Sequence, residues 1–133
     1  MTVYEHLEYF CFIKGLESSV VPSTIQFYCD LLSLTPYKLT MAGVLSGGNK
    51  RKMCVAMAMI GNPRMAFFDE PSAGVDPISR RYLWKCLSES ARSNNTSMVL
   101  TTHSMNEAES LCSSIGILIK GEFVCLDSPQ KLK

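Results

Sequence analysis

Apolar side chains recur at helical spacing through the N-terminal part of the chain. Thr2 and Glu5 have the spacing of a capping box, in which each side chain accepts a hydrogen bond from the other residue's backbone amide. They predict a helix that ends before Gly15. Further helices are expected over residues 24–32 and 46–60. Glycine and proline follow residue 60 and indicate the end of the second of these.

Short apolar runs then alternate with helical patterns. Residues 65–68 form an uninterrupted apolar run, which is typical of a strand buried on both faces, and residues 97–102 form a second strand. Between them, Pro77 opens a helix that Asp76 caps. The expected inner stripe of this helix consists of Ile78, Tyr82, Leu83 and Leu87.

The C-terminal part predicts a short helix and a hairpin. Ser104 and Glu107 have the spacing of another capping box. Residues 115–119 and 123–126 read as strands joined by a tight turn. Ser128, followed by proline, predicts the start of a last helix.

This order of elements indicates an α/β fold with a parallel sheet, preceded by a helical segment. We expect the boundary between the two parts near residue 60, so that residues 1–60 are helical and residues 61–133 belong to the α/β core.

Charge and cysteine content exclude several classes of function. Lys and Arg number 13 against 12 Asp and Glu, and a net charge of +1 favours neither nucleic acid nor an anionic membrane. The six cysteines form no C-x-x-C pair, so we expect them to be reduced, as in the cytosol, and we expect no zinc site. No apolar run approaches the ~20 residues of a membrane-spanning helix, so we expect membrane association only through a partner or another segment.

Polar residues follow both predicted strands: Asp69 and Glu70 the first, His103 the second. Ligands of an open parallel sheet bind beyond the carboxyl ends of its strands. Since successive strand residues point to opposite faces, Asp69 can hold Mg²⁺ while Glu70 polarises an attacking water. The alternatives are that both carboxylates merely end a strand and that His103 is a core or surface residue.

Ser46, Gly47 and Gly48 open the third predicted helix, where bare backbone amides and the positive end of the dipole favour an anion. The basic residues at 50–52 oppose the dipole, and a docked anion would offset that cost. The alternative is a solvated basic face. The role of Asp76 is also ambiguous: it could contact a ligand, but helix capping alone explains an aspartate at this position.

In their order and spacing these segments closely resemble ATP-binding cassette (ABC) nucleotide-binding domains. The residues that carry the resemblance are Leu45-Ser46-Gly47-Gly48-Asn49-Lys50-Arg51-Lys52, Arg64-Met65-Ala66-Phe67-Phe68-Asp69-Glu70-Pro71, Ser72-Ala73-Gly74-Val75-Asp76-Pro77 and Thr101-Thr102-His103-Ser104.

The resemblance implies a partial P-loop NTPase (RecA-like) core behind the helical subdomain of that family. It implies that residues 45–48 are the signature motif, that residues 65–69 are the Walker B strand and that Glu70 is the catalytic carboxylate. Residues 72–76 would be the D-loop, and His103 the switch histidine. The opening Thr2-Val3-Tyr4-Glu5-His6-Leu7, Asn49-Lys50-Arg51-Lys52 and Gly74-Val75-Asp76-Pro77 resemble subfamily A, whose members mostly export lipids.

The chain departs from the family pattern in three features that it lacks. It contains no Gly-x-x-x-x-Gly-Lys-Ser/Thr stretch, the Walker A loop that cradles the β- and γ-phosphates. The adenine-stacking aromatic residue and the glutamine loop, which in the family precedes the segment matching Thr2-Val3-Tyr4, are also missing. In the family's usual order, the strand before the Walker A loop lies between those at 97–102 and 115–119. We therefore expect a fragment, a truncated product or an incomplete gene model that is not ATPase-competent alone.

In the family, two cassettes sandwich ATP and Mg²⁺ between them. The resemblance implies that Ser46, Gly47 and Gly48 contact a nucleotide held by a second nucleotide-binding domain. It also implies transmembrane domains of a parent transporter as partners, a place on the cytosolic face of a membrane, and no nucleic acid. Two alternatives are a soluble ABC ATPase of translation or DNA repair, and an inactive product that presents its signature helix to another cassette.

Overall fold

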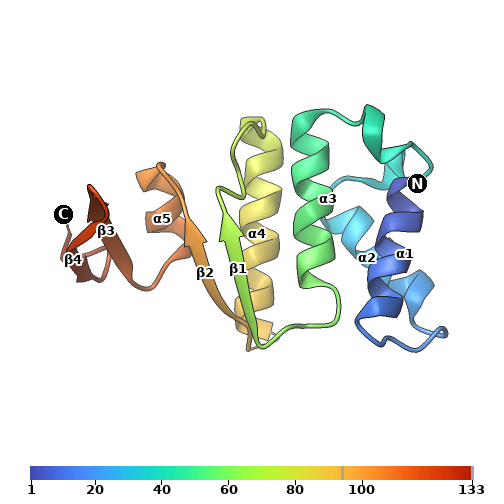
Figure 1. The fold of residues 1–133 in the computed structure, drawn as a ribbon, viewed down its shortest axis with the longest axis horizontal. Coiled ribbons are helices and arrows are strands. Elements are labelled where there is room, and N and C mark those ends of the chain that lie inside the picture. The colour runs from blue at the N-terminus through green and yellow to red at the C-terminus, as the bar shows by residue number, and fades with distance from the viewer. Residues whose placement is uncertain (94, 133) are drawn as a thin grey trace. The chain divides into compact units, whose positions relative to one another are not determined.

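The computed structural model describes residues 1–93 and 95–132. The chain divides into two compact units, Met1–Thr101 and Thr102–Lys133, and each is described by itself. The first unit holds α1 (Val3–Ile13), α2 (Val21–Leu31), α3 (Gly47–Met59), β1 (Met65–Asp69), α4 (Pro77–Ser93) and β2 (Ser97–Thr101) (Figure 1). Two short 3₁₀ helices, η1 (Thr35–Tyr37) and η2 (Ala42–Val44), lie between α2 and α3. The mixture of helices with a small parallel sheet confirms the predicted α/β class, whereas the boundary near residue 60 stays a prediction.

The capping box predicted at the start of α1 is present. The Glu5 amide donates to the Thr2 hydroxyl (3.2 Å), and the Thr2 amide donates to a Glu5 carboxylate oxygen (2.7 Å). The bond from the Thr2 amide lowers the pKa of the Glu5 carboxyl. The second helix begins at Val21, three residues before the predicted start, because Pro22 fits the first turn of a helix.

The C-terminal end of α3 is held by side chains from the two preceding helices. The Lys14 ammonium donates to the carbonyls of Met57, Ala58 and Ile60 (2.8, 2.7 and 2.9 Å). The Tyr28 hydroxyl donates to the Met59 carbonyl (2.9 Å), and burial raises the pKa of this hydroxyl to about 12. The last carbonyls of a helix lack intrahelical partners and attract cations, so these contacts satisfy them.

Replacing Lys14 by Met should loosen this end of α3 while leaving its other end intact. Losing a cation bonded to a helix C-terminus costs about 1–2 kcal/mol, so amide exchange at Ile60 should become roughly tenfold faster. Lys85→Met is the control, because Lys85 pairs with Glu89 on the exposed surface of α4. Equal exchange at Ile60 in the two variants would show that Lys14 does not hold the helix end.

Strands β1 and β2 pair in parallel, with Phe67 opposite Val99 and Asp69 opposite Thr101. The expectation that β1 is buried on both faces is wrong for this chain. Its side chains alternate: Ala66 and Phe68 are buried, whereas Phe67 is 72% exposed. The first unit therefore covers one face of this sheet and leaves an apolar face open.

The buried stripe of α4 also differs from the prediction. Leu83 and Leu87 are buried as expected, but Ile78 and Tyr82 are exposed. The stripe is completed by Cys86 and Ser90, at the helical spacing that continues from Leu83. The stripe therefore begins at Leu83 and does not include the exposed apolar side chains of Ile78 and Tyr82.

The second unit consists of α5 (Met105–Leu111), β3 (Ile115–Ile119) and β4 (Glu122–Asp127). The two strands form an antiparallel hairpin whose turn residues, Lys120 and Gly121, both have positive φ (52° and 84°), as tight two-residue hairpin turns require. The predicted last helix is absent from residues 128–132. The Lys131 amide bonds the Ser128 carbonyl (3.0 Å), which closes a single turn, not a helix.

Candidate functional site

The start of α3 is open toward solvent at Gly47 and packed at Gly48. Ser46 caps the helix, since its hydroxyl accepts from the Asn49 amide (3.3 Å). A Cβ built on Gly47 would meet no atom within 4 Å, so packing within this chain does not require glycine there. A Cβ on Gly48 would lie 3.4 Å from the Gly74 carbonyl oxygen, which brings the helix start against the turn at residues 74–75.

Lys52 lies on the packed side of α3. It is only 4% exposed, and its ammonium donates to the Ser79 hydroxyl over a long 3.4 Å. Burial lowers the pKa of this ammonium, while the Asp76 carboxylate acts in the opposite direction. The alternative of a solvated basic face over residues 50–52 therefore does not hold for Lys52, which sequence reasoning had grouped with its exposed neighbour Lys50.

Asp76 caps α4, as its sequence position predicts. One carboxylate oxygen accepts from the amides of Ser79 (3.0 Å) and Ile78 (3.2 Å). The bond from the Ser79 amide is the main reason why the pKa of this carboxyl is lowered. Asp76 is exposed, and its role toward a nucleotide stays a prediction.

The strand end carries both predicted carboxylates, but in different backbone environments. Asp69 is the last residue of β1, and one of its carboxylate oxygens accepts from the Thr101 hydroxyl (2.5 Å) across the strand pair. Glu70 follows the strand in the left-handed region (φ 49°), with its amide bonded to the Thr101 carbonyl (3.1 Å). The alternation argument used to separate the two side chains does not apply, because Glu70 is outside the strand.

His103 lies in the second unit, in an ordered turn before α5. The Thr102 hydroxyl donates to a carboxylate oxygen of the fully buried Glu107 (2.6 Å) and accepts from the Ser104 amide (3.1 Å). The turn exposes His103. Grouping of His103 with the carboxylates of the first unit stays a prediction.

Within the first unit the structure brings together the start of α3, the turn at residues 74–75 and the capped start of α4. Sequence reasoning missed Thr101 and the buried position of Lys52. The pairing of Asp69 with the last residue of the neighbouring parallel strand could have indicated Thr101. Over residues 1–93 and 95–132, no three or more His, Cys, Asp or Glu side chains gather as a metal site. An Mg²⁺ ion bound mainly through water and phosphate needs only one or two carboxylates.

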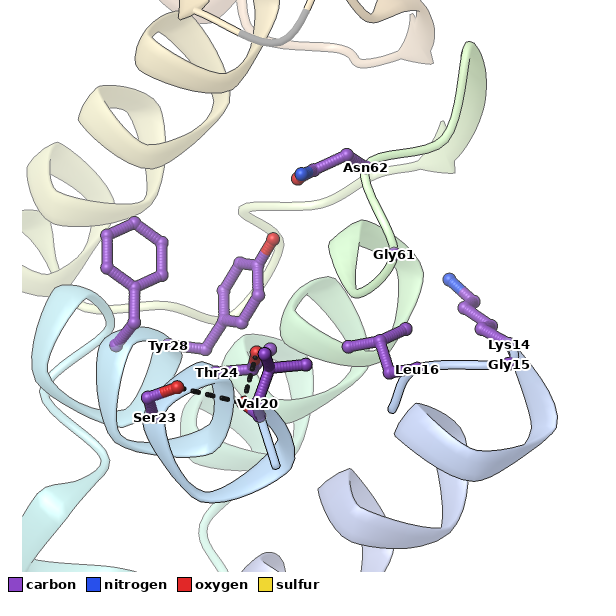
Figure 2. Close-up of a pocket in the computed structure, with 10 residues that line it drawn as sticks. Lys14, Gly15, Leu16, Val20, Ser23, Thr24, Tyr28, Gly61 and Asn62 are labelled. Atoms are coloured by element: carbon purple, nitrogen blue, oxygen red, sulfur yellow. Dashed lines mark hydrogen bonds between the residues drawn. The ribbon is translucent and has the colours of Figure 1, made fainter. Parts of the chain in front are cut away.

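A pocket of about 710 Å³ lies at the opposite end of α3 from Gly47. Figure 2 shows its walls: the α1–α2 connection with Lys14 and Leu16, the start of α2, and the turn at Gly61 and Asn62. The hydroxyls of Ser23 and Thr24 both donate to the Val20 carbonyl. None of the predicted site residues lines this pocket, so it is separate from the candidate site. In the described part of the chain, no helix is both long and apolar enough to span a bilayer.

Comparison with known proteins gives a consistent picture. A family described as "ABC transporter" matches residues 2–73, a span that includes Ser46, Asp69 and Glu70. From Homo sapiens, the phospholipid-transporting ATPase ABCA7 is 44% identical and the glucosylceramide transporter ABCA12 is 40% identical, each over all 133 residues of this chain. The human ATP-binding cassette sub-family A member 13 is 39% identical over the same residues. The chain spans only 6%, 5% and 3% of these three proteins, respectively.

Proposed function

Because this chain belongs to the ABC transporter family, we propose that it is part of a nucleotide-binding domain that couples ATP binding and hydrolysis to lipid transport across a membrane. One observation carries the proposal. A single family match spans both the Ser46-capped start of α3 and the strand end at Asp69 and Glu70, and both lie in the same compact unit. Two relatives over the full chain are named as lipid transporters, which favours transport over a role in translation or DNA repair.

The strand end serves the nucleotide held by the same domain. Asp69, which accepts a hydrogen bond from the Thr101 hydroxyl, would hold Mg²⁺ together with water and the phosphates. Glu70 would orient the water that attacks the γ-phosphate, and His103 would act as the switch histidine for the same nucleotide. A phosphate-binding loop is needed to hold the nucleotide, and these 133 residues contain no such motif. The chain alone is therefore not ATPase-competent.

The helix start serves the nucleotide held by a second nucleotide-binding domain. Ser46, Gly47 and Gly48 present backbone amides at the positive end of the α3 dipole, and Gly47 leaves space for a phosphate to reach them. Asp76 lies on the neighbouring turn, close to the same interface. The partners are then the second domain and the transmembrane domains of the transporter, with this domain on the cytosolic face of the membrane.

Gly47→Asp in the full transporter tests this assignment. A Cβ at this position meets no atom within 4 Å, so the start of the new side chain has space and the domain should fold normally. Its carboxylate would repel the triphosphate at the helix start, and ATPase activity should fall by about 100-fold or more. Gly43→Asp is the matched control, because a Cβ there also meets no atom within 4 Å and the variant should leave activity near wild type. Equal losses in the two variants, or none in Gly47→Asp, would contradict the assignment.

A further inference from the structure

The first four residues are hydrogen-bonded to the segment that leads to α3. The Val3 amide donates to the Thr40 carbonyl (3.0 Å), and the Ala42 amide donates to the Met1 carbonyl (3.0 Å). These two bonds flank an antiparallel bridge in which Thr2 pairs with Met41. We call residues 1–4 and 38–42 together the clasp.

A third backbone bond and a cation–π contact extend the clasp. The Tyr4 amide donates to the Lys38 carbonyl (2.9 Å), and the Lys38 ammonium lies 5.2 Å from the centre of the Tyr4 ring. The amides of Val3 and Tyr4 have no partner within α1, because the first amides of a helix lack intrahelical acceptors. The clasp satisfies them with carbonyls from more than 30 residues away in sequence.

The clasp connects to the candidate site through a short, bonded path. η2 follows directly, with the Val44 amide bonded to the Met41 carbonyl (3.1 Å) and the Leu45 amide bonded to the Ala42 carbonyl (3.3 Å). Leu45 is buried and precedes the helix cap Ser46. The single 3₁₀ turn of η2 and Leu45 therefore connect Met41 to Ser46, so the position of Met41 restrains that of Ser46.

We propose that the clasp positions the start of α3 for the nucleotide held by the second domain, so that the Val3 and Ala42 amides act as positioning groups. This inference rests on the proposed function, since it concerns the same phosphate-facing amides. The effect of the clasp is to keep Ser46 and Gly47 in the arrangement that binds phosphate, so that binding does not first have to order them.

Proline substitutions can remove each amide with little disturbance of the backbone. Val3 is the first residue of α1 and Ala42 the first of η2, where proline is tolerated. The preceding residues, Thr2 (φ −74°, ψ 170°) and Met41 (φ −60°, ψ 129°), already have the extended conformation that proline imposes on its predecessor. Val3→Ala and Ala42→Val are the matched controls, because they change side-chain volume but keep the amide.

In the full transporter, Val3→Pro and Ala42→Pro should each raise the apparent KM for ATP about threefold to tenfold, with kcat within about twofold of wild type. A smaller population of the competent arrangement weakens apparent binding but leaves the chemistry intact. The two controls should stay within about twofold of wild type in both constants. The double proline variant should lose less than the product of the single effects, because both amides close one bridge.

A cysteine pair at positions 2 and 41 provides a rescue. Residues paired in this way across antiparallel backbone lie about 4.5 Å apart at Cα, within the range that a disulfide spans. In the Val3→Pro background, oxidation of Thr2→Cys/Met41→Cys should restore the KM, and a reducing agent should reverse the effect. Without Val3→Pro, oxidation should leave both constants unchanged.

Three results would overturn the clasp proposal: a wild-type KM in both proline variants, equal shifts in their controls, or an oxidised pair that fails to restore the KM. None of these results bears on the proposed function, which Gly47→Asp tests separately. If Gly47→Asp leaves the full transporter active while the clasp variants shift the KM, the assignment of the start of α3 to phosphate binding is contradicted.

Discussion

Glu70→Gln in the full transporter should lower the steady-state rate of ATP hydrolysis by about 10²- to 10⁴-fold while ATP binding stays close to wild type. That range is the usual cost of losing general-base assistance. Glutamine keeps the size of the side chain and removes its charge, so the left-handed backbone at this position and the amide bond to Thr101 should persist. The measurement is ATPase activity alongside binding of a fluorescent nucleotide.

Two further variants test whether the loss of ATP hydrolysis is specific to Glu70. Asp69→Asn should shift the Mg²⁺ concentration required for activity, because Asp69 is assigned to the ion and not to the water. Glu89→Gln removes the same charge from the exposed surface of α4 and should have little effect. Wild-type hydrolysis in Glu70→Gln would show that another group orients the water.

The 133-residue chain expressed alone should be marginally folded and prone to associate. In the described part of the chain, β2 has β1 as its one strand partner, so its other edge carries unpaired backbone groups. The open face of this sheet exposes Phe67 and its cross-strand neighbour Val99. In the second unit the β3–β4 hairpin exposes Leu118 and Phe123, and a two-stranded hairpin is at best marginally stable in water.

The size of the expected effect follows from the missing strand. If a central strand of five residues buries on the order of 400 Å² of apolar surface, its absence costs roughly 10 kcal/mol at ~25 cal/mol per Å². A whole domain is held together by only ~5–15 kcal/mol. Sedimentation velocity should therefore show association, and thermal unfolding should be broad. Phe67→Thr should reduce association, because that side chain is exposed, whereas Phe68→Thr should unfold the sheet.

A soluble monomer with a sharp thermal transition and slow amide exchange at Val99 and Ile117 would contradict this expectation. It would show that β2 and β3 are protected by contacts that the exposure of their side chains does not indicate. The same chain should not bind MgATP tightly, and micromolar binding by calorimetry would show that the missing loop is not needed.

Local signals in the sequence predicted the helix caps and the tight turn well. Thr2 and Asp76 cap their helices as expected, because a cap depends on residues within one turn. The turn at Lys120 and Gly121 is similarly local. The positions of the candidate residues relative to these elements could therefore be predicted from short stretches of sequence.

Features that depend on distant parts of the chain could not be predicted. Lys14 directly follows α1, but the carbonyls that it bonds are 43 to 46 residues away. Burial of Lys52 depends on α4, and exposure of Phe67 depends on which elements are present to cover the sheet. The sequence left the buried face of α4 ambiguous, because Tyr82 and other apolar residues fit helical spacing on a different face from the one that is buried.

The backbone at Glu70 has a consequence for sequence design. A residue other than glycine or asparagine in the left-handed region is held there at a cost of order 1 kcal/mol. Glycine at this position would relieve that backbone cost. A sequence chosen only for its backbone conformation would therefore lose the carboxylate, so a redesigned domain needs Glu70 to be fixed in advance.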